Sequence, residues 1–364
     1  MQKIVTAAVG APIKTLNTVH KNMKKLSGYA TTRNCESLDY PYVESITSML
    51  QFCDEVCVLD TSDKDDGTRE RLQELVKTFN GKLVVKHVDL DWAAPNAGVY
   101  DGQTKQMARE MCTGDMLWQQ DVDEVLHESG YHLIRPLVEK LAPQLLVTPI
   151  ISLPIVEFWG NKLNGKVRLD VNLWKWRLSV NHPSIQHGIP MSHRALDITT
   201  GLMFAKSGTD GCDYIHTQTG QPIPSITLIP GNIENLRQEA VTNPILIEPM
   251  TEWLNQHIRD YPTVFHYSWF DMERKIKAYR EFWTGFWQSL YREEKKEEDN
   301  YFFPGRKWSS VTDEEIKQLA KTLETQTTGW IFHSPWNGQN HLGAFINLSH
   351  PKIMEDWINK RKMA

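Results

Sequence analysis

The 364-residue sequence has no long apolar run of the kind that crosses a membrane. Its longest apolar stretch, roughly residues 145–156, is interrupted by Pro149 and Pro154, whereas a transmembrane helix needs about 20 consecutive apolar residues. The first ten residues contain Lys3 as their one basic residue, which is a poor secretory signal. The sequence therefore predicts no integral membrane segment and no secretory leader.

Cysteine is scarce, and its spacing excludes the common zinc sites. The five cysteines are an odd number, and Cys53 and Cys57 have no second pair of matching spacing. This usage is typical of reduced, buried thiols, and it favours a cytoplasmic protein.

The chain also lacks an excess of positive charge, internal repeats and low-complexity linkers. The formal net charge is -5, which argues against a protein that binds nucleic acid through bulk electrostatics. The clearest basic cluster near a terminus is Lys14, Lys21, Lys24 and Lys25.

What the first 120 residues do contain is a regular alternation of strand and helix patterns. The predicted strands are residues 26–31, 55–60, 82–90 and 115–120, and the predicted helices are 41–53, 68–79 and 102–112. Strands separated by helices of this length predict an α/β fold with a doubly wound, mostly parallel, Rossmann-like sheet.

The pattern changes after residue 127. Residues 145–158 and 167–180 are predicted to be extended, whereas 130–141, 272–291 and 312–325 are predicted helices, the last with a Thr312–Glu315 capping box. We therefore expect a main domain over residues 1–250 and a mainly helical extension over residues 251–364.

Polar residues cluster where the predicted strands end. Thr31–Arg33, Asp60 and Asp121–Asp123 all fall at such ends, and sheets of this kind bind ligands beyond the carboxyl ends of their strands. The pair Asp121 and Asp123 offers the hard oxygen ligands that Mg2+ and Mn2+ prefer. A cation held there would act as a Lewis acid on a diphosphate leaving group.

Several segments together resemble the family 2 glycosyltransferases, particularly the lipopolysaccharide-core-type branch. Residues 114–126, GDMLWQQDVDEVL, resemble that branch's strand ending in lDaDEvl, and residues 59–68 resemble its vDsgStDgT turn with two extra residues. Residues 29–34 (YATTRN), 103–108 (QTKQMA) and 265–269 (FHYSW, followed by Lys275 and Tyr279) match in the same order. Lys105 and Gln106 stand where the family usually has Arg and Asn.

The resemblance implies a GT-A fold, a nucleotide-diphosphate sugar donor and Mn2+ or Mg2+ as cofactor. Residues 1–250 would bind the donor and acceptor, and residues 251–364 would complete the site. The implied roles are nucleobase contacts for Thr31 and Arg33, a base or ribose contact for Asp60, a diphosphate contact for Lys105, a ribose and metal contact for Asp121, and metal ligation for Asp123.

His266 is a third candidate metal ligand, with a buried core histidine as the alternative. A neutral imidazole suits Mn2+, and the FHYSW match places a histidine at this point. We expect His266 to stand at the end of a short apolar segment that begins at Val264, and residues 267–269 to form a turn. We expect Asp123 to be an exposed carboxylate at the end of its strand.

The catalytic base is less defined. In the related branch a glutamate follows a histidine on the acceptor side, but here Gly188 follows His187. His187 and Asp213, or Asp210, are the candidates for deprotonating the acceptor hydroxyl, and the stereochemical outcome is open.

The acceptor is expected to be a glycan or glycolipid. One alternative is a glycosyltransferase that acts on modified bases of viral DNA. Alternatives of other classes are a nucleotidyltransferase, which usually has a Gly-rich basic loop after its first strand that residues 30–36 lack, and a non-catalytic carbohydrate-binding module.

Overall fold

The structure of the chain is a computed structural model. It describes residues 25–94, 97–145, 147–160, 166–168, 174–188, 214–218, 223, 225–227, 260–285, 300, 302–325, 343–345 and 349–362, together with positions 245, 249, 252, 255 and 256. Asp210 and Asp213 lie outside the described residues.

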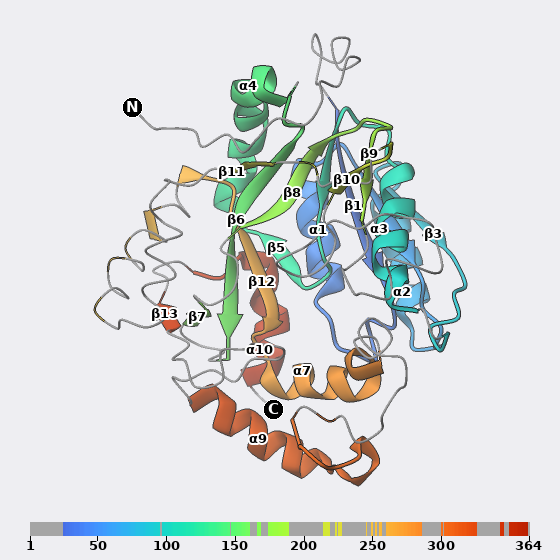
Figure 1. Cartoon of the computed structure of the whole chain (residues 1–364), viewed down its shortest axis with the longest axis vertical. Coiled ribbons are helices and arrows are strands. Elements are labelled where there is room, and N and C mark those ends of the chain that lie inside the picture. The colour runs from blue at the N-terminus through green and yellow to red at the C-terminus, as the bar shows by residue number, and fades with distance from the viewer. Residues whose placement is uncertain are drawn as a thin grey trace.

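The N-terminal half is a parallel sheet with helical crossovers (Figure 1). Its strands pair in the order β3-β2-β1-β4, every pair parallel. The strands are β1 (Leu26–Thr32), β2 (Glu55–Asp60), β3 (Leu83–His87) and β4 (Met116–Gln119), and the helices are α1 (Tyr42–Phe52), α2 (Thr68–Thr78) and α3 (Tyr100–Glu110). The predicted α/β fold is confirmed, because each element lies within a few residues of its expected position.

Helices cover both faces of this sheet, as a doubly wound fold requires. Ile46 of α1 and Leu72 of α2 pack with Val56 and Val58 in one apolar cluster. On the other face Ala108 of α3 packs with strand residues of opposite parity, Tyr29, Cys57, Leu59 and Leu117. This alternation of side chains between two apolar faces explains why β1, β2 and β4 are almost wholly buried.

Beyond β4 the sheet becomes mixed. An antiparallel strand, β8 (Trp174–Val180), lies between β4 and the long β6 (Ile150–Trp159). Shorter strands extend this side: β7 (Lys166–Arg168), β11 (Ser225–Thr227) and β13 (Gly343–Phe345). A separate antiparallel pair joins β9 (Ile185–His187) to β10 (Tyr214–His216). The segment expected to be extended over 167–180 contains β7 and β8.

A strand from the C-terminal part enters this sheet. β12 (Val264–Trp269) pairs antiparallel with β5 (Glu124–Leu126) and parallel with β6, and Figure 1 shows it in orange beside the green β6. All six of its residues are buried. The expectation of a turn at 267–269 is therefore wrong, because Tyr267 and Trp269 are large aromatic residues that suit a buried strand.

Helices complete the C-terminal part. They are α7 (Met272–Ala278) with a following π-helical turn η5 (Tyr279–Trp283), α9 (Asp313–Thr325) and α10 (Glu355–Lys362). The Thr312–Glu315 capping box is confirmed, because Glu315 N–H donates to Thr312 Oγ1 at 3.3 Å and Thr312 N–H donates to Glu315 Oε2 at 2.9 Å. The domain boundary at residue 250 stays a prediction.

The remaining short elements connect the layers. They are η2 (Ala97–Val99), η3 (Glu128–Leu133), α4 (Ile134–Leu145), η6 (Trp308–Ser310) and η7 (Lys352–Met354). Across the described ranges, no helix has the length and apolar character that a membrane crossing demands.

Candidate functional site

The carboxyl ends of three parallel strands meet at one edge of the sheet. β1 ends at Thr32, β2 at Asp60 and β4 at Gln119, with Thr32 and Asp60 paired in register. Thr31 is partly exposed, whereas Thr32 and Asp60 are buried. The structure therefore brings the predicted strand-end residues to a common edge.

Asp60 holds this edge together through a dense set of hydrogen bonds. Its Oδ1 accepts from Thr32 Oγ1 at 2.8 Å and from Ser62 Oγ at 2.7 Å. Its Oδ2 lies 2.8 Å from His87 Nδ1 at the end of β3. Asp60 thus ties three neighbouring strand ends to one another, and its contact with a base or ribose stays a prediction.

Arg33 packs against two aromatic rings from distant parts of the chain, and the two rings also contact each other. Its guanidinium is 4.6 Å from the Trp92 ring centroid and 4.2 Å from that of Phe282 in η5. It also forms a 2.9 Å ion pair with Asp63. The C-terminal part therefore packs over the residue predicted to contact the nucleobase.

Asp121 is held by two cations. Its Oδ1 is 3.1 Å from Lys105 Nζ and its Oδ2 is 3.1 Å from Arg177 Nη2. Burial alone would raise the pKa of this carboxyl, but Lys105, Arg177 and Lys175 bring it well below its usual range. The predicted neighbours Lys105 and Asp121 are thus in contact, and Asp121 is ionised.

Arg177 on β8 is a site residue to which the sequence analysis assigned no role. Besides its ion pair with Asp121, it donates two hydrogen bonds to the fully buried Glu124, from Nε to Oε2 at 2.8 Å and from Nη2 to Oε1 at 2.5 Å. It also donates to Gln119. The signal available in the sequence was a pair of cations, Lys175 and Arg177, two apart in an otherwise apolar and aromatic strand.

Asp123, His266 and Glu157 form a second polar chain. His266 Nε2 lies 3.2 Å from Asp123 Oδ1, and its Nδ1 lies 2.5 Å from Glu157 Oε2. All three residues are buried. The expectation of an exposed Asp123 is therefore wrong, because β12 covers this carboxylate: Tyr267 N–H donates to the Asp123 carbonyl oxygen at 2.7 Å.

The strand register explains the contact between His266 and Glu157. His266 is paired with Glu124 across β5 and with Glu157 across β6. Directly paired residues of neighbouring strands project to the same face, so three ionisable side chains share one row. Glu157 was also not predicted as a site residue, although it is the single carboxylate in the otherwise largely apolar strand β6.

The charges in this chain depend strongly on one another. Burial alone would lower the pKa of the His266 imidazole, but Glu157 and Asp123 raise it to about 10. Burial would raise the pKa of Asp123, but His266, Lys275 and Arg274 hold it far below its usual range. In the absence of a bound ligand His266 is therefore a cation between two carboxylates.

The donor set fits a divalent cation in part. A carboxylate and an imidazole nitrogen stand side by side at Asp123 and His266. Glu157 accepts a hydrogen bond from the other ring nitrogen, as a carboxylate commonly does behind a metal-bound histidine. Asp121 faces Lys105 and Arg177, and its predicted ribose and metal contacts stay predictions. Among the described residues no three His, Cys, Asp or Glu side chains gather into a group that could hold a metal by itself. Further ligands would have to come from a bound donor or from water.

His187 belongs to a buried aromatic cluster. Its Nε2 is 2.6 Å from the Tyr29 hydroxyl, which in turn is 2.7 Å from the Tyr214 hydroxyl. Its backbone N–H donates to Gln106 Oε1 at 2.9 Å, one residue from Lys105. A role for His187 as catalytic base stays a prediction.

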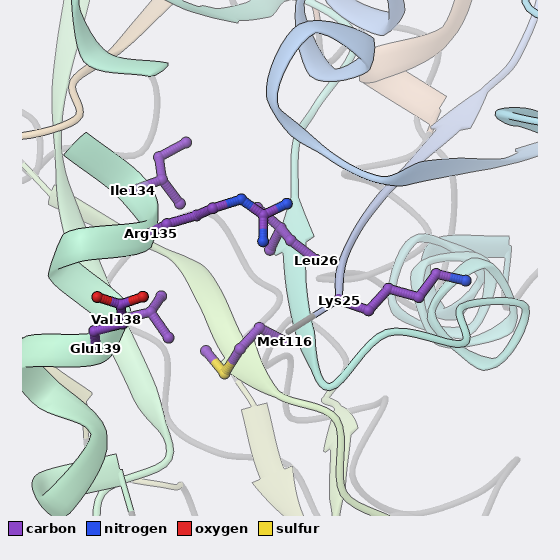
Figure 2. A pocket seen from close by; sticks show the side chains of 7 residues that line it. All are labelled: Lys25, Leu26, Met116, Ile134, Arg135, Val138 and Glu139. Atoms are coloured by element: carbon purple, nitrogen blue, oxygen red, sulfur yellow. The ribbon is translucent and has the colours of Figure 1, made fainter. Parts of the chain in front are cut away.

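A pocket lies at the other end of the parallel strands, where β1 and β4 begin (Figure 2). Leu26 and Met116, the first residues of β1 and β4, form its floor with Ile134 and Val138 of α4. The cations at its rim are paired with carboxylates: Lys25 with Glu55 at 2.7 Å and Arg135 with Asp54 at 2.8 Å. None of the predicted site residues lines it.

Comparison with known proteins gives structural similarities only. No protein-family model matches the chain, and no curated protein matches it in sequence. Residues 1–349 of TarS from S. aureus, solved with UDP, are 14% identical over 73% of this chain and 81% of that chain, with a TM-score of 0.31.

Two further solved structures are similar over smaller regions. The mannosyltransferase PcManGT from Pyrobaculum calidifontis, with GDP-Man and Mn2+, is 15% identical over 38% of this chain and 41% of that chain, at a TM-score of 0.24. Glucosyl-3-phosphoglycerate synthase from Mycobacterium tuberculosis, with Mn2+, UDP and glucosyl-3-phosphoglycerate, is 17% identical over 44% and 52%, at a TM-score of 0.23. Because these values are all low, the fold class of the chain rests on its own strand order and helix packing.

Proposed function

We propose that this chain is a glycosyltransferase that moves a sugar from a nucleotide-diphosphate sugar to an acceptor hydroxyl, with Mn2+ or Mg2+ bound. The observation that carries the proposal is the Asp123–His266–Glu157 chain at the carboxyl edge of the parallel strands, beside Lys105 and Asp121. The resemblance of residues 114–126 and 265–269 to the lipopolysaccharide-core-type branch of family 2 supports it further.

The proposed division of labour follows from the contacts. Asp123 and His266 Nε2 would hold the cation, and Glu157 would keep the Nδ1 proton so that Nε2 is the nitrogen left for the metal. Because His266 is protonated without a ligand, metal binding would release a proton. When bound, the cation would stabilise the negative charge of the departing nucleoside diphosphate.

The first strands would hold the rest of the donor. Thr31, Arg33 and Asp60 would contact the nucleoside, and Lys105 would contact the diphosphate beside Asp121. The acceptor would be a glycan or glycolipid, with His187 or Asp213 as the base that removes its proton. Residues 1–250 would bind both substrates, and residues 251–364 would complete the site through His266.

A thermal-shift screen of nucleoside diphosphates tests the donor assignment. UDP, GDP or a related diphosphate should raise the melting temperature with Mn2+ or Mg2+ and not with chelator. At about 100 times its dissociation constant such a ligand adds roughly 2.7 kcal/mol of stability. If no nucleoside diphosphate stabilises the chain in the presence of metal, the assignment fails.

The His266→Ala variant tests the metal site. If His266 is a ligand, metal-dependent nucleotide binding should weaken by more than about tenfold, or roughly 1.4 kcal/mol. A core histidine would give the opposite pattern, a large loss of stability with nucleotide affinity kept in the folded fraction. Measuring the melting temperature and the affinity on this one variant separates the two roles.

A further inference from the structure

Lys275 on α7 is a buried cation whose charge no described residue balances by direct contact. Its side chain lies in the core beside β12, and the residue is only 6% exposed. Its Nζ donates to the Ser268 hydroxyl at 2.6 Å. Within the part of the chain that the structure describes, this is its one hydrogen bond, and no carboxylate lies within ion-pair distance. An ammonium carries three N–H donors, so two remain for another acceptor.

Aromatic rings surround the same ammonium. Its Nζ is 5.5 Å from the ring centroid of Trp269, 5.6 Å from that of Tyr279 and 5.2 Å from that of Trp283. Ring faces attract a cation, but they accept no strong hydrogen bond. This surrounding keeps Lys275 in place without neutralising it.

Lys275 is electrostatically linked to the Asp123–His266–Glu157 chain. Burial lowers the pKa of its ammonium to about 8, and Arg274 and Lys175 act in the same direction, whereas Asp123 and Glu157 oppose them. The charge of Lys275 in turn lowers the pKa of Asp123. The unbalanced ammonium therefore lies in the neighbourhood of the candidate metal ligands.

We propose that Lys275 is a binding point for a phosphate group, beside the cation held at Asp123 and His266. The inference rests on the proposed function for the identity of the ligand, the diphosphate of the donor. A buried charge without a counter-ion is costly, and a phosphate oxygen would supply both the missing negative charge and the missing acceptors. The aromatic surround would strengthen this contact by excluding water.

Lys277, two residues along the same helix, provides a matched control. It forms a 2.7 Å ion pair with Glu273 and lies 3.5 Å from Asp313, with its side chain 35% exposed. Helix, residue type and formal charge are therefore the same, and only the burial and the counter-ion differ.

The experiment measures binding of UDP and GDP with Mn2+, of uridine and guanosine, and of inorganic pyrophosphate with Mn2+ to the full chain. Hydrogen bonds to charged groups contribute about 1.5–3 kcal/mol, so Lys275→Met should weaken diphosphate and pyrophosphate binding on the order of tenfold to a hundredfold. Nucleoside binding should stay unchanged. Lys277→Met should bind every probe as the wild type does.

Stability distinguishes this role from a structural one. Because Lys275→Met replaces a buried charge by an apolar chain of similar length, its melting temperature without ligand should equal or exceed that of the wild type. If the Met variant does not fold, Lys275→Gln, which keeps an N–H donor for Ser268, should fold and show the same selective loss of phosphate affinity. A folded Met or Gln variant that binds the diphosphates and pyrophosphate as the wild type does would overturn the inference, as would an equal loss of nucleoside binding.

Failure of the proposed function gives a different result. In that case the wild type binds neither UDP nor GDP with metal, yet pyrophosphate still binds to the wild type and not to Lys275→Met, which supports the phosphate site by itself. Pyrophosphate that fails to bind the wild type, or that binds both proteins equally, overturns the phosphate site.

Discussion

Two ionic clusters stand side by side at the carboxyl edge of the sheet, and they are built in different ways. In the first cluster, Arg177 forms ion pairs with both Asp121 and Glu124, so that each carboxylate faces a cation. In the second, His266 lies between Asp123 and Glu157, and Lys275 is electrostatically linked to both carboxylates. The first cluster is satisfied within the protein, whereas in the second the ammonium of Lys275 makes one hydrogen bond, to Ser268, among the described residues.

This difference separates a scaffold from a binding site. Charges that are fully paired and buried hold elements in register, and removing one partner costs stability. Charges that are only partly balanced keep binding capacity for a ligand, and removing one of them costs function. Single substitutions inside and outside the two clusters test this division.

Removing the cation of the first cluster should produce the largest loss of stability. Arg177→Met leaves the fully buried Glu124 with Lys175, 3.6 Å away, as its remaining cation. We expect the free energy of unfolding to fall by about 3–5 kcal/mol, measured by urea denaturation. Arg135→Met, which breaks the exposed pair with Asp54, serves as the control and should cost less than about 1 kcal/mol. Equal losses in the two variants would contradict the scaffold role.

Asp123→Asn should chiefly affect transfer. Loss of a metal-ligand charge is expected to lower turnover at least about a hundredfold, or roughly 2.7 kcal/mol. Because Asp123 is buried against His266, some stability should be lost too, though less than in Arg177→Met. Sugar transfer and a melting curve are measured together, with the surface variant Asp313→Asn as control. A folded Asn variant with near-normal turnover would remove Asp123 from the site.

Arg361 tests whether α10 fastens the C-terminal part to the first strands. Its guanidinium lies 3.4 Å from the Trp357 ring centroid, donates to Asp39 in the loop after β1, and pairs with Asp271 at 3.3 Å. Arg361→Ala should lower the free energy of unfolding by about 2 kcal/mol. Lys360→Ala changes an exposed residue of the same helix and should have little effect. Similar stabilities for the two variants would show that the contacts of Arg361 do not contribute to the free energy of unfolding.

Glu55 begins β2, at the end of the strands away from both clusters. Its substitution should have the smallest effect on stability, and that effect should depend on pH. Burial would raise the pKa of its carboxyl, but hydrogen bonds from Lys25, Ser27 and Thr113 lower it to about 2. A carboxyl with a lowered folded-state pKa adds stability above its unfolded pKa of about 4.3, and that stability is lost as the pH falls toward 2.

The comparison for this prediction is between the wild type and Glu55→Gln. The wild type should be more stable by about 1 kcal/mol at pH 7, because the Lys25 partner is largely solvent-exposed. The difference should shrink between roughly pH 5 and pH 2. A stability difference that does not change with pH would mean that the charge of Glu55 is not its source.

Local patterns in the sequence were sufficient to predict the parallel half of the fold. The alternation of β-branched segments with helices such as 68–79 predicted β1 to β4 and their crossovers, because hydrophobic periodicity is a property of adjacent residues. The same reasoning predicted that Asp60 and Asp121 would follow strand ends and therefore share an edge. Exposure was harder to predict, as Asp123 demonstrates, because it depends on what covers an edge.

The fold class, the strand-end carboxylates and the histidine of the FHYSW segment follow from local patterns in the sequence. The pairing of β12 with both β5 and β6, through which His266 contacts Glu157, 109 residues away in the chain, arises from the packing of distant segments. The same packing placed Arg177 on Asp121 and left Lys275 without a counter-ion among the described residues. Strand pairing at long range depends on the packing of the whole core, and no local period records which distant charges that packing brings into contact.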